Sequence, residues 1–99
     1  MSEIIEKETT KQAVKPPSMW QVILINDDYT TVEFVIDCLV YVFNKTEDEA
    51  ARITIDVHKK GRGIVGRYTK DIATTKQRDA QEYAKSLGHP LQIIAEPEA

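Results

Sequence analysis

The chain has little of what disulfide, metal or membrane chemistry requires. Its 99 residues include a single cysteine, Cys38, so no internal disulfide can form, and no Cys and His residues have the spacing of a zinc site. No apolar run approaches the ~18 to 20 residues of a membrane span. Residues 1–12 lack an apolar core of signal-peptide length. These absences favour a reducing compartment, and we expect a soluble, cytoplasmic protein without a metal or other cofactor.

Sequence signals of catalysis are also missing. No Ser, Cys or Thr lies in a recognisable nucleophile motif, and neither a glycine-rich phosphate loop nor a calcium-type ladder of acids occurs. The formal net charge is −3, whereas a dedicated nucleic-acid-binding domain is normally clearly basic. The composition therefore argues against an enzyme, a metal protein and a nucleic-acid-binding protein.

The order of sequence patterns predicts a flexible arm followed by one small domain. Residues 1–17 are rich in Glu, Lys and Thr and end in two prolines, which is typical of an unstructured arm. Residues 18–99 form the predicted core domain. β-Branched runs predict strands at residues 19–25, 63–68 and 91–95, and helical spacing predicts helices at residues 30–43, 46–60 and 69–87. We expect an α+β fold in the order β-α-α-β-α-β, with a small, mostly antiparallel three-stranded sheet packed against three helices.

Threonines are expected to start all three helices. Thr30 with Glu33, and Thr46 with Glu49, have the spacing of capping boxes, and Thr69 precedes the third helix. Gly61 is the expected left-handed cap of the second helix. The residues expected to face the core from the third helix are Ile72, Ala80, Tyr83, Ala84 and Leu87, with Lys76, Arg78 and Lys85 in water. Residues 96–99 are expected to fray.

Three consecutive polar residues, Asn26, Asp27 and Asp28, follow the first expected strand. Asn and Asp turn the chain well because their short side chains bond nearby backbone N–H groups, so a turn into the first helix is the favoured interpretation. The same residues offer many acceptors and two negative charges, which suit a small cation or a protonated amine. The pattern alone leaves both interpretations open.

The histidines and the basic stretch have ordinary interpretations as well. His58 lies in the last turn of the second helix, where the helix dipole favours a positive charge, and His89 is expected in a surface turn. The cations expected on a solvated face, rather than against nucleic acid, are Lys59, Lys60, Arg62, Arg67 and Lys70.

Several separate segments match one family in the same order. They are Lys15-Pro16-Pro17-Ser18-Met19, Val22-Ile23-Leu24, Asn26-Asp27-Asp28-Tyr29-Thr30, Glu33-Phe34-Val35-Ile36, Val57-His58 with Gly61, Thr69, Ala73 to Lys76, and His89-Pro90-Leu91. From Lys15 onward the chain therefore resembles the ClpS family of adaptors that serve bacterial Clp AAA+ unfoldases. The resemblance implies a non-enzymatic adaptor. Such an adaptor binds N-degrons, meaning proteins with a free, bulky hydrophobic first residue such as Leu, Phe, Tyr or Trp, and delivers them for degradation.

The resemblance also implies roles for individual residues. Asn26, Asp27 and His58 would bond the substrate's α-amino group, which leaves Asp28 to the turn. The pocket for the first side chain would be lined by Leu24, Thr30, Val32, Val35, Thr54, Val57 and Leu91. Asp71 and Lys76 would contact the N-terminal domain of a ClpA-type unfoldase, and the arm before Pro16 would serve delivery. We expect a monomer.

The chain departs from the family pattern beside the pocket. Val32 and Thr54 stand where Met is common, which predicts a wider pocket or mouth and altered selectivity among first residues, and Thr31 replaces a frequent proline. Two alternatives from other classes remain open. One is a small hydrolase or metal protein using Asp27, Asp28 and His58, and the other is a ribosome-associated module using the basic residues between Lys59 and Lys70.

Overall fold

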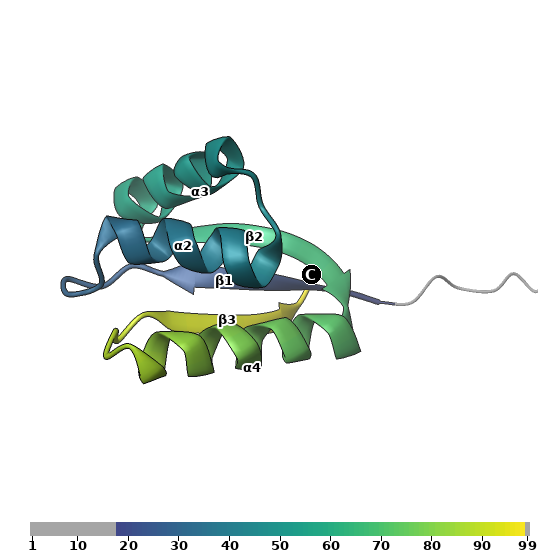
Figure 1. Ribbon diagram of the computed structural model, residues 1–99. Helices are drawn as coiled ribbons and strands as arrows, with labels where there is room; N and C mark the ends of the chain where they lie inside the picture. Colours follow the sequence, from purple (N-terminus) through teal and green to yellow (C-terminus); the bar gives the residue numbers. More distant parts are fainter. Residues whose placement is uncertain (1–17, 99) are drawn as a thin grey trace, which may run out of the picture.

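The computed structural model describes residues 18–98. The expected arm over residues 1–17 lies outside the described residues. The elements, labelled as in Figure 1, are β1 (Met19–Ile25), α2 (Val32–Phe43), α3 (Glu47–Lys60), β2 (Arg62–Thr69), α4 (Lys70–Ser86) and β3 (Gln92–Pro97). The predicted α+β class and element order are confirmed.

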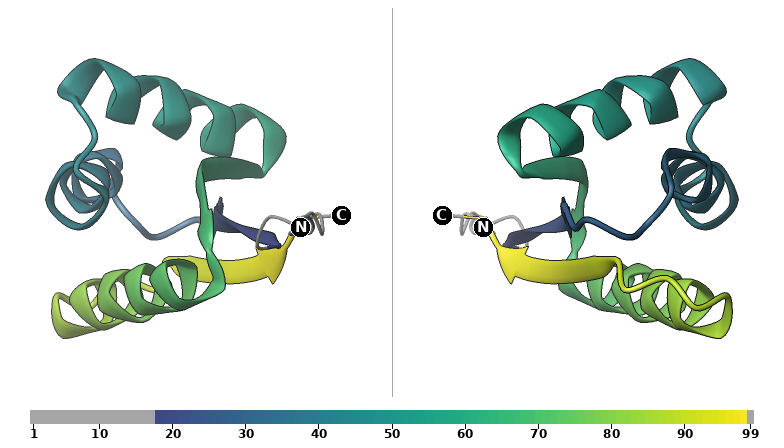
Figure 2. Two further views of the ribbon diagram at one scale, coloured as in Figure 1. Left: turned by 90° about the vertical axis from the view of Figure 1, so that its right-hand side faces the viewer. Right: turned by 90° about the vertical axis from the view of Figure 1, so that its left-hand side faces the viewer.

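The sheet has the strand order β2-β1-β3, and both strand pairs are antiparallel. Helices α2, α3 and α4 all lie on the same side of it (Figure 2). The pairing shifts within β1, where Val22 lies opposite Gly66 but Ile23 lies opposite Ile64, so that Val65 is an extra residue on β2. Such a bulge increases the local bend and twist of a strand. The side chain of Val65 is buried in the core.

The hydrophobic core lies between this sheet and the helices. Val22 and Leu24 of β1 enter it from the central strand, and Phe34 and Leu39 enter it from α2. Both β1 residues are completely buried. The central position of β1 explains why its sequence is apolar on consecutive residues, since Ile23 on the alternate position is buried too.

Helices α2 and α3 both begin at a threonine N-cap, but only that of α3 is the threonine that the sequence predicted. Helix α3 has the predicted capping box, because Thr46 Oγ1 accepts from Glu49 N at 3.1 Å and Glu49 Oε1 accepts from Thr46 N at 2.9 Å. The predicted cap of α2 by Thr30 is wrong. Thr31 is the N-cap, accepting from Phe34 N at 3.1 Å, because the Thr30 hydroxyl already donates to Asp27.

Helix α4 approaches the sheet through small side chains. Its buried residues are Ala73, Ala80 and Ala84, whereas Ile72 and Leu87, predicted to face the core, are about half exposed. Small residues allow the helix to lie close to the strands, which the size of Ile or Leu would prevent. Thr69 occupies the N-cap position, but its side chain makes no capping hydrogen bond.

Glutamine side chains join α4 to the outer strand. Gln77 Nε2 donates to Ile93 O at 2.8 Å, Gln81 Nε2 donates to Leu91 O at 2.7 Å, and Gln81 Oε1 accepts from Ile93 N at 3.0 Å. These bonds satisfy backbone groups at the free edge of β3, which would otherwise be open to another strand.

The C-terminal end is ordered further than the sequence predicted. Strand β3 runs to Pro97 instead of ending at Ala95, and Glu98 N donates to Met19 O at 2.9 Å. Acidic side chains that suggested fraying pair with β2, with Arg67 Nη2 2.7 Å from Glu98 Oε1. The expectation of a frayed end is therefore wrong for residues 96–98, because their partners are distant in the sequence.

Candidate functional site

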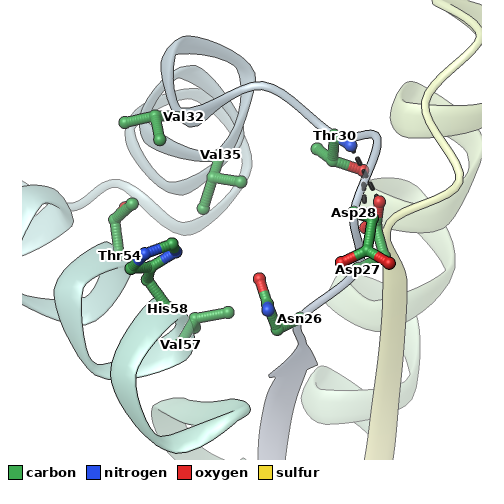
Figure 3. A pocket seen from close by; sticks show the side chains of 9 residues that line it. All are labelled: Asn26, Asp27, Asp28, Thr30, Val32, Val35, Thr54, Val57 and His58. Atoms are coloured by element: carbon green, nitrogen blue, oxygen red, sulfur yellow. Dashed lines mark hydrogen bonds between the residues drawn. The ribbon is translucent and has the colours of Figure 1, made fainter.

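A hollow of about 260 Å³ opens where β1 ends. The loop after β1 forms one side, the start of α2 forms a second, and the C-terminal half of α3 forms the third (Figure 3). We call it the first hollow. Its lining residues are Asn26, Asp27, Asp28, Thr30, Val32, Val35, Thr54, Val57 and His58.

Asn26 and His58 face each other across this hollow. The backbone N–H of Asn26 donates to Gly61 O at 2.9 Å, which ties the end of β1 to the left-handed cap of α3. Their side chains point into the space between them from opposite sides (Figure 3). Two residues that are over thirty positions apart in the sequence are thus brought to one site, as the family resemblance required.

Asp27 holds the turn after β1. Its Oδ1 accepts from Tyr29 N at 2.8 Å and from Thr30 N at 2.7 Å, and its Oδ2 accepts from Thr30 Oγ1 at 2.7 Å. Burial raises the pKa of this carboxyl, but the hydrogen bonds from Thr30 and Tyr29, with the nearby His89, outweigh burial and leave the pKa below its ordinary value. Asp27 is therefore ionised at neutral pH.

Asp28 lies beside it with a different environment. The residue is exposed and lines the same hollow, and within residues 18–98 its carboxylate has neither a hydrogen-bond donor nor an ion-pair partner. Of the two acids at the lip, Asp28 is thus the one whose oxygens are free to meet a ligand.

The remaining wall is apolar. Val35 and Val57 are buried residues of α2 and α3 that meet at the hollow. Thr54 is also buried, and its hydroxyl donates to Ala50 O at 2.7 Å, so no unpaired donor is left in the wall. Val32 stands at the mouth, with 55% of its surface exposed.

Two residues expected in the pocket lie elsewhere. Leu24 and Leu91 are buried in the hydrophobic core and are not among the lining residues of the first hollow. Both belong to the core cluster of buried residues, and an apolar pattern in the sequence cannot distinguish a core residue from one that faces a cavity.

The arrangement combines a polar lip with an apolar interior. The polar groups are an amide, an imidazole, two carboxylates and the Thr30 hydroxyl, and three valines with Thr54 form the rest of the lining. A ligand that fits must therefore carry a positive or hydrogen-bond-donating group directly beside an apolar group.

Comparison with known proteins assigns the chain to a family. A family model described as "ATP-dependent Clp protease adaptor protein ClpS" matches residues 15–94. The chain belongs to the ClpS family. A ClpS adapter from Acetivibrio thermocellus is 49% identical over 99% of this chain and all of its own length, and one from Ralstonia nicotianae is 47% identical over 90% of this chain and 82% of its own.

A solved structure of a ClpS protein has the same fold. The structure of Agrobacterium tumefaciens ClpS2 bound to L-phenylalaninamide matches with a TM-score of 0.81 and 40% identity, covering 84% of this chain and all of the other. The resemblance read from the sequence segments is confirmed, and the chain is a member of a family of Clp protease adapters.

The residues that the ClpS resemblance places at the unfoldase lie on α4, away from the first hollow. Asp71 and Lys76 line a separate hollow of about 380 Å³ with Ile72, Thr75 and Asp79. Lys76 was expected in water, but its Nζ donates to Val42 O at 3.2 Å and lies 5.9 Å from the centroid of the Tyr68 ring. Its position is therefore fixed by α2 and β2.

Sequence reasoning missed the environment of His89. The residue directly follows the turn at residues 87–88, as expected, but it is half-buried and its ring stacks on Phe34 with centroids 4.2 Å apart and an interplanar angle of 18°. It also lies close enough to Asp27 to lower the pKa of that carboxyl. The turn sequence gave no signal of this contact, because Phe34 is more than fifty residues away.

Apart from Lys59, each cation of the basic stretch has a partner within residues 18–98. Lys60 lies 3.8 Å from Asp56, Arg62 lies 3.5 Å from Glu96, and Arg67 pairs with Glu98. Lys70 lies 5.5 Å from the centroid of the Trp20 ring. These contacts fit the solvated face that the sequence predicted. They give no support to a ribosome-associated role.

Neither a metal-binding group nor a membrane-spanning helix occurs in the described part of the chain. Among residues 18–98, no group of three or more His, Cys, Asp or Glu side chains is placed to hold a metal ion. None of the helices there combines the length and the apolar character that crossing a membrane requires.

Proposed function

We propose that the protein is a non-enzymatic adaptor that binds the free N-terminus of proteins whose first residue is bulky and hydrophobic. It hands them to a Clp AAA+ unfoldase for degradation. The single observation that carries the proposal is the first hollow, in which a polar lip adjoins an apolar wall. The ligand of the A. tumefaciens relative, L-phenylalaninamide, has two parts that would complement such a lip and wall, namely a free α-amino group and an apolar side chain.

The lip suits an α-ammonium group. An ammonium group has three N–H donors that diverge, and a buried one needs an acceptor for each. Asn26 offers an amide oxygen, His58 offers a ring nitrogen, and Asp27 and Asp28 offer carboxylate oxygens and negative charge. The free carboxylate of Asp28 favours it for the direct bond. Asp27, which the family resemblance puts there, has three acceptor positions occupied and contributes mainly its charge.

The apolar wall suits the first side chain. Val32, Val35, Thr54 and Val57 would surround it, and burying a large apolar side chain stabilises a complex by about 1.5 to 3 kcal/mol. Because the lip requires a free amine and the wall requires an apolar group, acetylated N-termini and internal residues lack one of the two.

The partner for delivery is proposed from the family. The N-terminal domain of a ClpA-type unfoldase would dock on α4 at Asp71 and Lys76, which lie on a different part of the surface from the first hollow. The two binding events can therefore occur on one monomer at once.

Binding of a fluorescent peptide beginning with Leu or Phe tests the proposal. The free peptide should bind, while its N-acetylated form should bind at least about 100-fold more weakly, because the bound peptide would cover the acceptors of the lip without offering them the donors of an ammonium group. Binding should be insensitive to EDTA, and the peptide should remain uncleaved, which separates the adaptor from a hydrolase or metal protein. Equal affinity of the free and acetylated peptides would overturn the proposal.

A further inference from the structure

A second hollow adjoins the first along α3. It has a volume of about 250 Å³ and is lined by Val32, Thr54, Ile55, His58 and Lys59. Val32, Thr54 and His58 line both hollows, so these three side chains form a shared rim (Figure 3). A chain whose first side chain fills the first hollow would cross this rim and reach the second.

The second hollow exposes apolar surface at its floor. Ile55 is 51% exposed although its side chain is large and apolar, and Val32 is slightly more exposed. Residues 54, 55, 58 and 59 are spaced to form one face of α3, which runs beside the start of α2. Lys59 adds an apolar stem and a cation that has no acidic partner within residues 18–98.

We infer that this second hollow is the subsite for the second residue of the bound N-terminus, and that it selects an apolar side chain there. The inference rests on the proposed function, since it takes the first residue to occupy the first hollow. Continuity across the rim points to the second residue, because consecutive Cα atoms are only about 3.8 Å apart and the residue after the first therefore lies at the rim. Since a fully extended backbone directs successive side chains to opposite faces, the bound peptide must bend at the rim for both side chains to enter. The Lys59 ammonium disfavours a basic second residue through like charge.

Four peptides that differ only in the second residue test the subsite. They begin Leu-Leu, Leu-Ser, Leu-Glu and Leu-Lys, and fluorescence anisotropy gives their dissociation constants. Partial burial of the second Leu against Ile55 should make Leu-Leu bind about fivefold more tightly than Leu-Ser. Leu-Lys should bind more weakly than Leu-Glu, and the difference should shrink at high salt.

A pair of matched variants locates the effect. Ile55→Ser should remove the advantage of Leu-Leu over Leu-Ser. Ile64→Ser is the control, because Ile64 is 53% exposed and lies on β2 outside both hollows, and it should preserve the advantage. Circular dichroism checks that both variants are folded.

The outcomes separate the subsite from the proposed function. If Leu-Ser binds but Leu-Leu gains nothing, or if its gain persists in Ile55→Ser, the subsite is wrong and the proposed function stands. If none of the free peptides binds better than its acetylated form, both are overturned.

Discussion

The size of one side chain, that of residue 32, governs access to the first hollow. Val32 lies at the mouth, half exposed, at the position where the family resemblance led us to expect the longer Met. Its β-branched side chain is short and stiff, so it narrows the opening less than Met would and adapts less to different ligands.

Val32→Met should therefore change the ranking of first residues. A Trp-first peptide should lose about tenfold in affinity relative to a Leu-first peptide, because a pocket wall that gains volume rejects the wider ring more strongly. Titration of both peptides against both proteins measures the ratio. Ile64→Met, the same kind of change outside both hollows, should leave this ratio of affinities unchanged. If Val32→Met also leaves the ratio unchanged, residue 32 does not determine the ranking of first residues.

The neighbouring acids differ in what they do, although the sequence presents them as a pair. Asp27 accepts three hydrogen bonds within its own turn, and its pKa is lowered from 3.8. A carboxyl with a lowered folded-state pKa stabilises the fold above its ordinary pKa and loses that contribution as pH falls through the folded value.

Asp27→Ala and Asp28→Ala should consequently separate stability from binding. Asp27→Ala should lower the free energy of unfolding by about 1 kcal/mol at pH 7, and should flatten its decline below about pH 4. Asp28→Ala should leave the stability curve nearly unchanged and weaken peptide binding. Urea unfolding from pH 2 to 7, with peptide titration at pH 7, measures both, and equal destabilisation by the two variants would contradict the division.

At the scale of elements, the junction between α3 and β2 holds the first hollow in shape. Gly63 lies on the core face of β2, where an added Cβ would come within 2.7 Å of Val57 Cγ2 and 3.3 Å of Ile53 O. Glycine therefore allows the helix to lie directly against the strand, and Val57 is held at the wall of the hollow as a result.

Gly63→Ala should push α3 away from β2. We expect a loss of about 1 to 3 kcal/mol in the free energy of unfolding, as in other overpacked cores, together with weaker peptide binding because Val57 and His58 move. Gly61→Asn is the matched control at the same junction. A Cβ there meets nothing within 4 Å, and Asn tolerates the left-handed backbone of φ 85°, so its effect should be smaller. Equal stability of Gly63→Ala and the wild type would show that α3 is not held by this contact.

Local patterns predicted the elements but not their contacts. The bounds of β1 and the capping box of α3 were correct, because both depend on residues within one short segment. The cap of α2 was assigned one residue early, since the sequence cannot show that Thr30 is already bonded to Asp27. The end of β3 and the core positions of Ile72 and Leu87 on α4 were wrong, whereas Ala80 and Ala84 were correct, because the wrong predictions depend on distant partners such as Arg67 and the strands beneath α4.

At the scale of the whole molecule, the candidate site is an assembly of three segments that the sequence keeps apart. Asn26, Val35 and His58 meet because β1, α2 and α3 converge, and only the family resemblance linked them beforehand. Leu24 and Leu91 came with the same resemblance, yet lie in the core and not in the hollow's lining, because side-chain packing decides which apolar residues face a cavity.

The reactivity of the Cys38 thiol can show whether the segments around the first hollow open separately or only when the whole domain unfolds. The thiol lies on α2 with no exposed surface, and burial raises its pKa to about 11. Since the thiolate is the reactive form, Cys38 should not react with a disulfide reagent at pH 8 until the domain unfolds. Its labelling rate in urea should follow the unfolding transition measured by circular dichroism.

Glu82→Cys in a Cys38→Ala background, on the exposed side of α4, should react at the rate of a free thiol without urea. Rapid native labelling of Cys38 would instead mean that α2, and with it the mouth of the first hollow, opens on its own.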